Sequence, residues 1–205
     1  MRSAWIGLVL LTLLTLSRDL GAAEPPVTAL AFTPEGGGVV IGSQSGLVER
    51  SWPELKRLRA VSSELSHIHA LAFAPNGKTL AVAGGSPARS GGFELLGWPA
   101  GERLASTPHR DLVLDVSWRS GSREFATASA DQSVAIHSAE TGRTVRVLRG
   151  HSRAVLAVAF LPDDIGLVSA GIDESLRLLY SQSGNLDRTL SNHPTAVLGL
   201  SVRPA

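Results

Sequence analysis

Four histidines recur along the chain at equal intervals of 42 residues, and they are His67, His109, His151 and His193. Imidazole groups bind metals such as zinc and transfer protons near neutral pH. Two of these histidines also precede an aspartate by 22 residues, which places Asp131 after His109 and Asp173 after His151. The spacing therefore suggests either a metal or acid–base site or a structural contact that is repeated once in each unit.

An apolar, strand-like run follows each histidine, as in IHALAF, LVLDVSW, AVLAVAF and AVLGLSV. Three further short runs, separated by turn residues such as Asn76-Gly77, lead to the next histidine. Four short strands joined by such turns form an antiparallel meander. Units are predicted near 27–66, 69–107, 111–149 and 153–191, and a single strand is predicted near 196–203. Four aromatic residues are expected to occupy equivalent, buried first-strand positions: Phe32, Phe73, Trp118 and Phe160.

The period and the histidine positions make the chain similar to the WD-repeat family, whose units of about 40 to 45 residues carry Gly-His near the start and Trp-Asp near the end. Gly150-His151 is the one intact Gly-His pair, and Leu179-Tyr180 stands where family members usually have Trp-Asp. The resemblance covers about 27–205. It implies an all-β fold, a β-propeller of four-stranded antiparallel blades, with about four blades plus one strand and an incomplete ring.

The resemblance also implies a structural role for the histidines. In WD-repeat blades a histidine before the first strand bonds an aspartate in the turn between the second and third strands, and a Ser or Thr extends the network. The matching residues are His109, Thr127 and Asp131 in one unit, and His151, Ser169 and Asp173 in the next. Such a network satisfies buried polar groups. A metal needs ligands that converge on one point, whereas successive blades spread these histidines around a ring.

Other chemical signals are few. The chain has no cysteine, phosphate loop, GxSxG elbow, HExxH pair or EF-hand spacing, so we expect no catalytic residue, metal or cofactor. Asp163-Asp164 falls in an expected turn, where a solvated turn is favoured over calcium binding or acid catalysis. Trp52 and Trp98 are expected to pack between blades, with stacking on a sugar or peptide as the alternative.

The first 23 residues are typical of a secretory signal peptide, because an apolar stretch of 13 residues is followed by the small residues Gly21, Ala22 and Ala23. Cleavage after Ala23 removes two of the 19 basic and one of the 18 acidic side chains, which leaves no formal net charge. The sequence thus predicts an exported, periplasmic or extracellular protein without stable membrane insertion, with a membrane anchor as the alternative. A neutral surface does not favour nucleic acid.

The predicted mature part, 24–205, contains about 4.3 periods, whereas WD-repeat propellers usually have seven blades. Three explanations stay open at this point: a fragment of a longer propeller, completion of the ring by a second chain, and a small four-bladed closure. An incomplete ring exposes edge strands, which are an aggregation liability, and self-association is one way to complete the ring.

Two functions are compatible with these features. The first is a non-catalytic scaffold that binds a protein partner of unknown identity. The alternative is a fragment or regulatory part of a larger exported enzyme, either a hydrolase or a quinone-dependent oxidoreductase, although no convergent polar site supports it. The stretch 85–92 is longer than in the other units and carries Arg89. Ordinary variation in the length of a surface loop is the favoured interpretation. The alternative is that Arg89, together with Arg110 and Arg153, contacts an acidic or carbonyl-rich protein surface.

Overall fold

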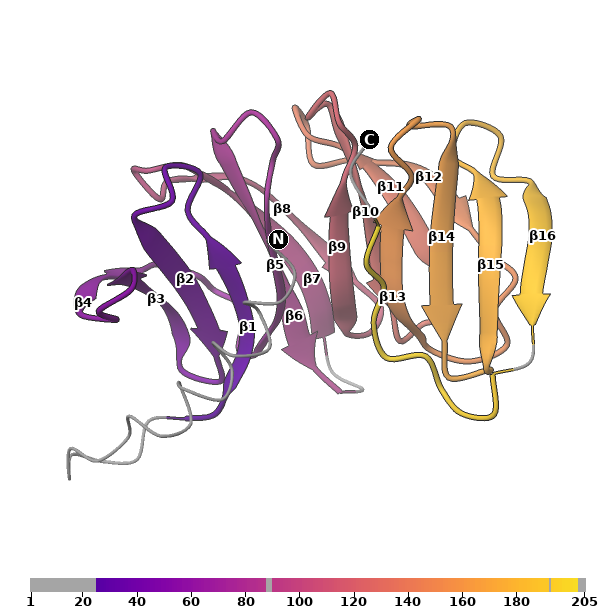
Figure 1. The fold of residues 1–205 in the computed structure, drawn as a ribbon, viewed down its shortest axis with the longest axis horizontal. Helices are drawn as coiled ribbons and strands as arrows, with labels where there is room; N and C mark the ends of the chain where they lie inside the picture. Colours follow the sequence, from indigo (N-terminus) through magenta and orange to yellow (C-terminus); the bar gives the residue numbers. More distant parts are fainter. Residues whose placement is uncertain (1–24, 88–89, 192, 203–205) are drawn as a thin grey trace.

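The computed structural model describes residues 25–87, 90–191 and 193–202, and its described part contains sixteen β-strands in four sheets (Figure 1). We call the sheets blades 1 to 4. Blade 1 consists of β1 (Val27–Phe32), β2 (Gly38–Ser43), β3 (Gly46–Ser51) and β4 (Arg57–Val61). Blade 2 consists of β5 (Ile68–Phe73), β6 (Thr79–Ser86), β7 (Ser90–Gly97) and β8 (Arg103–His109).

Blades 3 and 4 repeat this arrangement. Blade 3 consists of β9 (Val113–Trp118), β10 (Glu124–Ser129), β11 (Val134–Ser138) and β12 (Thr144–Leu148). Blade 4 consists of β13 (Val155–Phe160), β14 (Gly166–Gly171), β15 (Ser175–Tyr180) and β16 (Leu186–Ser191). In every blade each strand pairs antiparallel with the strand next to it in sequence. The prediction of an all-β fold built from four-stranded antiparallel blades is confirmed.

Short turns connect the strands, and the residues in them have the conformations that tight turns require. In the turn between β5 and β6, Gly77 has φ +70°, and its N–H donates to the carbonyl of Ala74 at 2.8 Å. A left-handed φ of this kind favours glycine, which carries no Cβ. The Asn76 side chain accepts the N–H of Lys78 at 2.9 Å in the same turn. Local sequence therefore fixes where one strand ends and the next begins.

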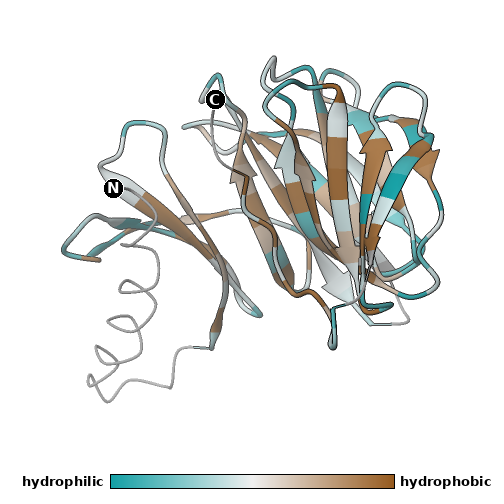
Figure 2. Ribbon diagram, turned by 45° about the vertical axis from the view of Figure 1, so that its right-hand side comes forward, coloured by the Kyte–Doolittle hydropathy of each residue, from teal (hydrophilic) through white to brown (hydrophobic). Residues whose placement is uncertain are grey.

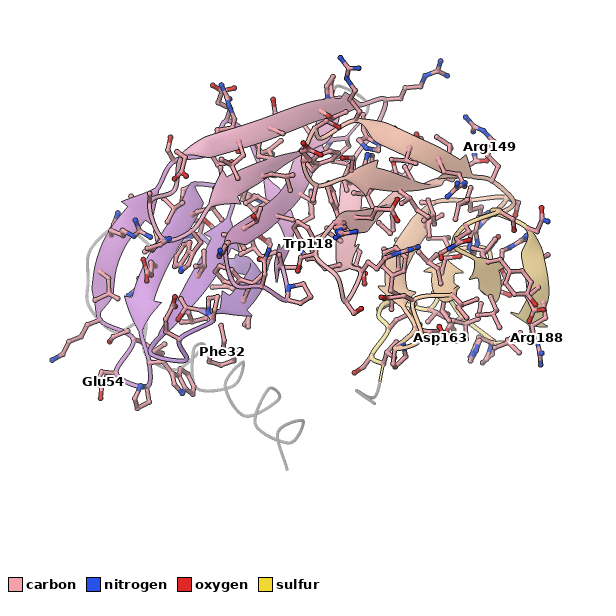
Figure 3. The ribbon with its side chains drawn as sticks, turned by 90° about the horizontal axis from the view of Figure 1, so that it is seen from above. Phe32, Glu54, Trp118, Arg149, Asp163 and Arg188 are labelled. Atoms are coloured by element: carbon pink, nitrogen blue, oxygen red, sulfur yellow. The ribbon has the colours of Figure 1, made fainter. Side chains whose placement is uncertain are left out.

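The four blades stand side by side in an arc (Figures 1 and 3). The first strands β1, β5, β9 and β13 are neighbours of one another in that order, and the last strand of each blade forms its outer edge. Apolar side chains pack between neighbouring blades. Figure 2 shows the hydrophobic residues as brown bands along the strands. The seam between blades 3 and 4, for example, buries Ile136 and Leu148 against Phe160.

The strand register places the four first-strand aromatic residues at equivalent positions, but they are not equally buried. Trp118 and Phe160 are buried, at 9% and 7% exposure, and Phe73 is half-buried. Phe32, in contrast, is 37% exposed, so the expectation of burial is wrong for this residue. The physical reason is its place in the array, because no blade precedes blade 1 among the described residues to cover that face.

The single strand expected near 196–203 is also wrong for the residues that the structure describes. Residues 193–202 contain no strand, and 203–205 lie outside the described part. A strand is stabilised by hydrogen bonds to a neighbouring strand, and this segment has no ladder partner. The described residues contain no helix long and apolar enough to cross a membrane.

Candidate functional site

In blade 4 the structure brings His151, Asp173 and Ser169 together. His151 lies in the loop before β13 and is buried, with Nδ1 2.9 Å from Asp173 Oδ1 and Nε2 2.8 Å from Ser169 Oγ. Asp173 also accepts the N–H of Ser152 at 3.0 Å and the hydroxyl of Ser175 at 2.8 Å. These contacts tie the loop before β13 to the turn between β14 and β15.

The electrostatics of this cluster favour an ionised aspartate beside a neutral histidine. Burial raises the pKa of Asp173, but hydrogen bonds from His151, Ser152 and Ser175 outweigh burial and lower this pKa to about 2. Burial lowers the pKa of His151, although the bond to Asp173 opposes that effect. Because an ionised carboxylate only accepts hydrogen bonds, His151 donates Nδ1–H to it and accepts the Ser169 hydroxyl at Nε2. The side chains of His151, Asp173 and Ser169 therefore all form hydrogen bonds within blade 4.

In blade 3 the corresponding residues are arranged differently. Thr127 hydrogen-bonds Nε2 of His137 at 2.9 Å instead of contacting His109. Nε2 of His109 is buried without a hydrogen-bond partner, and Asp131 accepts the N–H of Ser133 at 3.0 Å. Within the described residues, His109 and Asp131 form neither a hydrogen bond nor an ion pair. The structure therefore does not assemble the His109, Thr127 and Asp131 network expected from the sequence.

The different partner of Thr127 arises from one position on the third strand of each blade. His137 on β11 pairs with Phe125, and Leu179 on β15 pairs with Leu167 at the equivalent register. Leucine offers no polar group, so Ser169 remains available to His151. In blade 3, His137 takes the threonine hydroxyl, and its Nδ1 contacts Thr144 Oγ1 at 3.2 Å.

His137 is fully buried among aromatic rings. Its ring centroid lies 4.6 Å from that of Phe93, 5.1 Å from that of Phe125 and 5.5 Å from that of His109. Burial, together with the nearby His109, lowers the pKa of His137 to about 3, so the ring is neutral near pH 7. No role was predicted for this residue from the sequence. A polar residue within the apolar strand SVAIHS was the available signal.

Two carboxylates on β7 and β9, the first buried and the second half-buried, were also not predicted from the sequence. Glu94 on β7 is 2% exposed and accepts the Ser63 hydroxyl at 2.8 Å and the Glu64 N–H at 3.0 Å, which joins blade 2 to the loop after β4. Asp115 on β9 accepts the N–H of Val158 on β13 at 2.8 Å. Burial raises the pKa of Asp115 to about 6 even though backbone N–H donors lower it.

Asp115 belongs to a contact that is particular to blade 3. The hydroxyl of Ser117, two residues further along β9, accepts the N–H of Phe160 at 3.1 Å. The positions equivalent to Asp115 and Ser117 are alanines in the other three first strands, as the sequences TALAF, HALAF and LAVAF show. Two side chains of β9 thus bind backbone donors on the edge of β13. The Asp-Val-Ser interruption of the alanine pattern was a readable signal.

The structure describes two of the three arginines that were expected to contact a partner. Arg110 and Arg153 are exposed, in the loops before β9 and β13. Those loops lie on one face with the turns between second and third strands, because Ala130 N–H bonds the Leu112 carbonyl at 2.9 Å and Ile172 N–H bonds the Ala154 carbonyl at 2.9 Å. Arg89 lies outside the described residues.

Two tryptophans and one aspartate that the sequence singled out contact other groups of the protein itself. Trp98 lies in the seam between blades 1 and 2, with the guanidinium of Arg59 4.9 Å from its ring centroid. Trp52 instead packs edge-on against Phe32 of its own blade at 5.1 Å. Asp163 accepts the N–H groups of Ile165 and Gly166 at 2.9 and 3.1 Å. In the described part of the chain, no three His, Cys, Asp or Glu side chains are grouped as metal ligands.

Residues 142–178 match the family model "WD domain, G-beta repeat". These residues are thus similar to one WD repeat. The matched unit runs from the turn before β12 to β15, and it contains both His151 and Asp173. The matched segment therefore includes the last strand of blade 3 and three strands of blade 4.

Two plant proteins show the same relationship. The chain is 26% identical over 110 residues to the "WD repeat-containing protein VIP3" of Arabidopsis thaliana, which covers 48% of this chain and 34% of that protein. It is 28% identical over 154 residues to the Arabidopsis thaliana "Transcriptional corepressor LEUNIG_HOMOLOG", which covers 70% of this chain and 19% of that protein. The matches thus span about a third and a fifth of those relatives. Together they support a WD-repeat family for this chain.

Proposed function

We propose that this WD-repeat array is a non-catalytic scaffold that binds a protein partner. The observation that carries the proposal is how the array uses its periodic polar groups. His151, Asp173 and Ser169 bond one another within blade 4, and Thr127 bonds His137 within blade 3. Such contacts hold the loops of one face in place, and rigidly held loops are a common basis for recognition. The WD-repeat relatives favour the same function.

The binding face we propose is the one that carries the histidine loops. Arg110 and Arg153 are exposed there, and among the residues the structure describes neither forms an ion pair. A guanidinium group is planar, is always charged and presents several donors, so it suits carboxylates and backbone carbonyls. Arg89, by its place in the stretch 85–92, is proposed to lie on the same face. The partner would therefore present an acidic or carbonyl-rich surface.

The test is a pull-down with a matched control. The variant Arg89→Ala, Arg110→Ala, Arg153→Ala is compared with the native protein and with Arg123→Ala, Arg143→Ala. Arg123 and Arg143 are exposed in turns on the opposite face. We expect the triple variant to lose a partner that the control retains, at equal thermal stability. Identical partners at equal yield from all three proteins would show that these three arginines do not form the binding face. Turnover of a candidate substrate would favour the enzyme alternative.

Export and the boundaries of the mature array belong to the same proposal. Residues 1–23 lie outside the described residues, and they are proposed to act as a signal peptide that leaves 24–205 as the propeller segment. We expect N-terminal sequencing of the secreted protein to begin at Glu24. Accumulation in the producing cell with an intact N-terminus would contradict export, and it would leave the scaffold proposal to be decided by the pull-down.

A further inference from the structure

The three internal seams between blades share one construction. Residues from the second, third and fourth strands of a blade face the next blade, and in blade 3 they are Ala126, Val134, Ile136 and Leu148, each at most 4% exposed. They pack against Val158, Phe160 and Leu167 of blade 4. Burial of this apolar surface is what holds neighbouring blades together.

Blade 4 has the same kind of face, with no further blade over it in the described part of the chain. The strand registers align four residues of blade 4 with the four named above: Val168, Leu176, Leu178 and Leu190. Leu190 is 48% exposed, whereas its counterpart Leu148 is 4% exposed. The other three are half-buried. Blade 4 therefore presents an apolar face of the composition that the internal seams bury.

The opposite end of the array carries a group that fits such a face. In blade 2, Phe73 packs edge-on against Trp98, with ring centroids 5.0 Å apart, and the pair fills the seam against blade 1. Phe32 and Trp52 of blade 1 form the same edge-on pair at 5.1 Å. Farther along this face Val39 and Ile41 are buried, but Phe32 remains 37% exposed. The Phe32–Trp52 pair thus matches the pair that fills the seam between blades 1 and 2, but no blade packs against it in the described part of the chain.

In blades 1 and 3, an arginine on the fourth strand also contacts the next blade. Arg59 of blade 1 lies over Trp98 of blade 2 at 4.9 Å. The register-equivalent Arg146 of blade 3 donates Nη1–H to the carbonyl of Ser181 at 2.8 Å, in the position of blade 4 that corresponds to Trp98.

Blade 4 has Arg188 at this arginine position, since it pairs with Leu178 as Arg146 pairs with Ile136. Its side chain is 66% exposed and contacts the adjacent Asp187 at 3.0 Å. Figure 3 shows Phe32 and Arg188 at the two ends of the arc.

From this correspondence we propose that the free face of blade 4 binds blade 1 of a second copy of this chain. The Phe32–Trp52 pair of one copy enters the face formed by Val168, Leu176, Leu178 and Leu190 of the other. The guanidinium of Arg188 lies over Trp52, as that of Arg59 lies over Trp98. An arginine over a tryptophan face is attractive, and its aliphatic stem covers apolar surface.

This contact joins two different surfaces, so it is heterologous. Two copies related by rotation about the propeller axis would form it twice and would produce a closed ring of eight blades, a number that propellers accommodate. Closure would cover the exposed part of Phe32 at one end of the array and the apolar face of blade 4 at the other. The proposal goes beyond the scaffold function, because self-association uses the ends of the arc and not its loop face.

Cross-linking tests the pairing directly, because the chain contains no cysteine. The single variants Arg188→Cys and Trp52→Cys are mixed and treated with a short bismaleimide. We expect a covalent dimer in the mixture and much less of it with either variant alone. Arg143→Cys, on an exposed turn of blade 3, replaces Arg188→Cys as the matched control and should give no dimer. Equal cross-linking with the control would overturn the proposal.

Sedimentation velocity provides the second measurement. We expect the native chain to form a dimer, with Arg188→Ala weakening the dimer about fivefold, as the loss of a cation–π contact predicts. Leu178→Glu, which places a charge on the apolar face, should abolish it, and Arg143→Ala should leave it unchanged. A chain that is monomeric at every concentration, or a dimer that is insensitive to both Arg188→Ala and Leu178→Glu, would overturn the proposal.

Discussion

Replacement of His137 by leucine should make the stability of the protein less sensitive to acid. The folded state holds this histidine in neutral form with a pKa of about 3, whereas the unfolded chain has the ordinary value of 6.5. Between these values the unfolded state binds more protons, so the free energy of unfolding falls as the pH falls below about 6.5. Leucine is the natural choice because Leu179 occupies the equivalent position of blade 4.

The size of the effect follows from the two pKa values. At pH 5 the unfolded histidine is almost fully protonated and the buried one is not, so lowering the pH from 7 to 5 removes about 2 kcal/mol of stability through this residue. His137→Leu should remove that loss. The variant also leaves the Thr127 hydroxyl without its partner, so its stability at pH 7 changes by a separate amount, on the order of 1 kcal/mol.

Urea unfolding followed by tryptophan fluorescence at pH 7, 6 and 5 measures the difference. The informative quantity is the change in free energy of unfolding between pH 7 and pH 5, compared between native protein and variant. His193→Gln, a substitution at an exposed histidine, is the matched control and should retain the native pH dependence. If His137→Leu loses as much stability as the native protein between pH 7 and pH 5, the burial argument is refuted.

Three other predictions concern the networks and the seams. His151→Ala should lower the melting temperature without changing the metal content measured by mass spectrometry, and stoichiometric zinc that disappears in this variant would contradict the structural role. Phe160→Ala should cost about 3–5 kcal/mol in urea unfolding, as buried aromatics do, and Phe32→Ala clearly less because Phe32 is 37% exposed; equal costs would contradict the unequal burial.

Asp115 should act with the opposite sign to His137: its folded pKa of about 6 lies above the ordinary 3.8, so its stabilising contribution is present below pH 3.8 and disappears as the pH rises through 6. Asp115→Asn should therefore recover up to about 3 kcal/mol relative to the native protein between pH 4 and pH 7, and parallel pH profiles would show that burial does not shift this carboxyl group.

Much of the fold could be predicted from the sequence because its signals are local. The 42-residue histidine period, the short apolar runs and turns such as Asn76-Gly77 specify four antiparallel strands per unit. Each strand pairs with its neighbour in sequence, so no long-range choice of partner is needed. The blade 4 contact between His151 and Asp173 was predicted from the resemblance to the WD-repeat family, and the structure has it at 2.9 Å.

Only the tertiary structure shows which residues at equivalent positions of the blades differ in burial and in hydrogen bonding. Phe32 and Phe160 occupy the same place in their strands, but burial depends on whether another blade lies against them. His109 and His151 have the same spacing to an aspartate, but only His151 forms the contact. His109 instead pairs with Gly91 at the end of β8, and His137 from another strand takes the Thr127 hydroxyl in blade 3. The period of a sequence defines a position within its blade, whereas burial and hydrogen bonding depend on which atoms the neighbouring strands and blades bring against it.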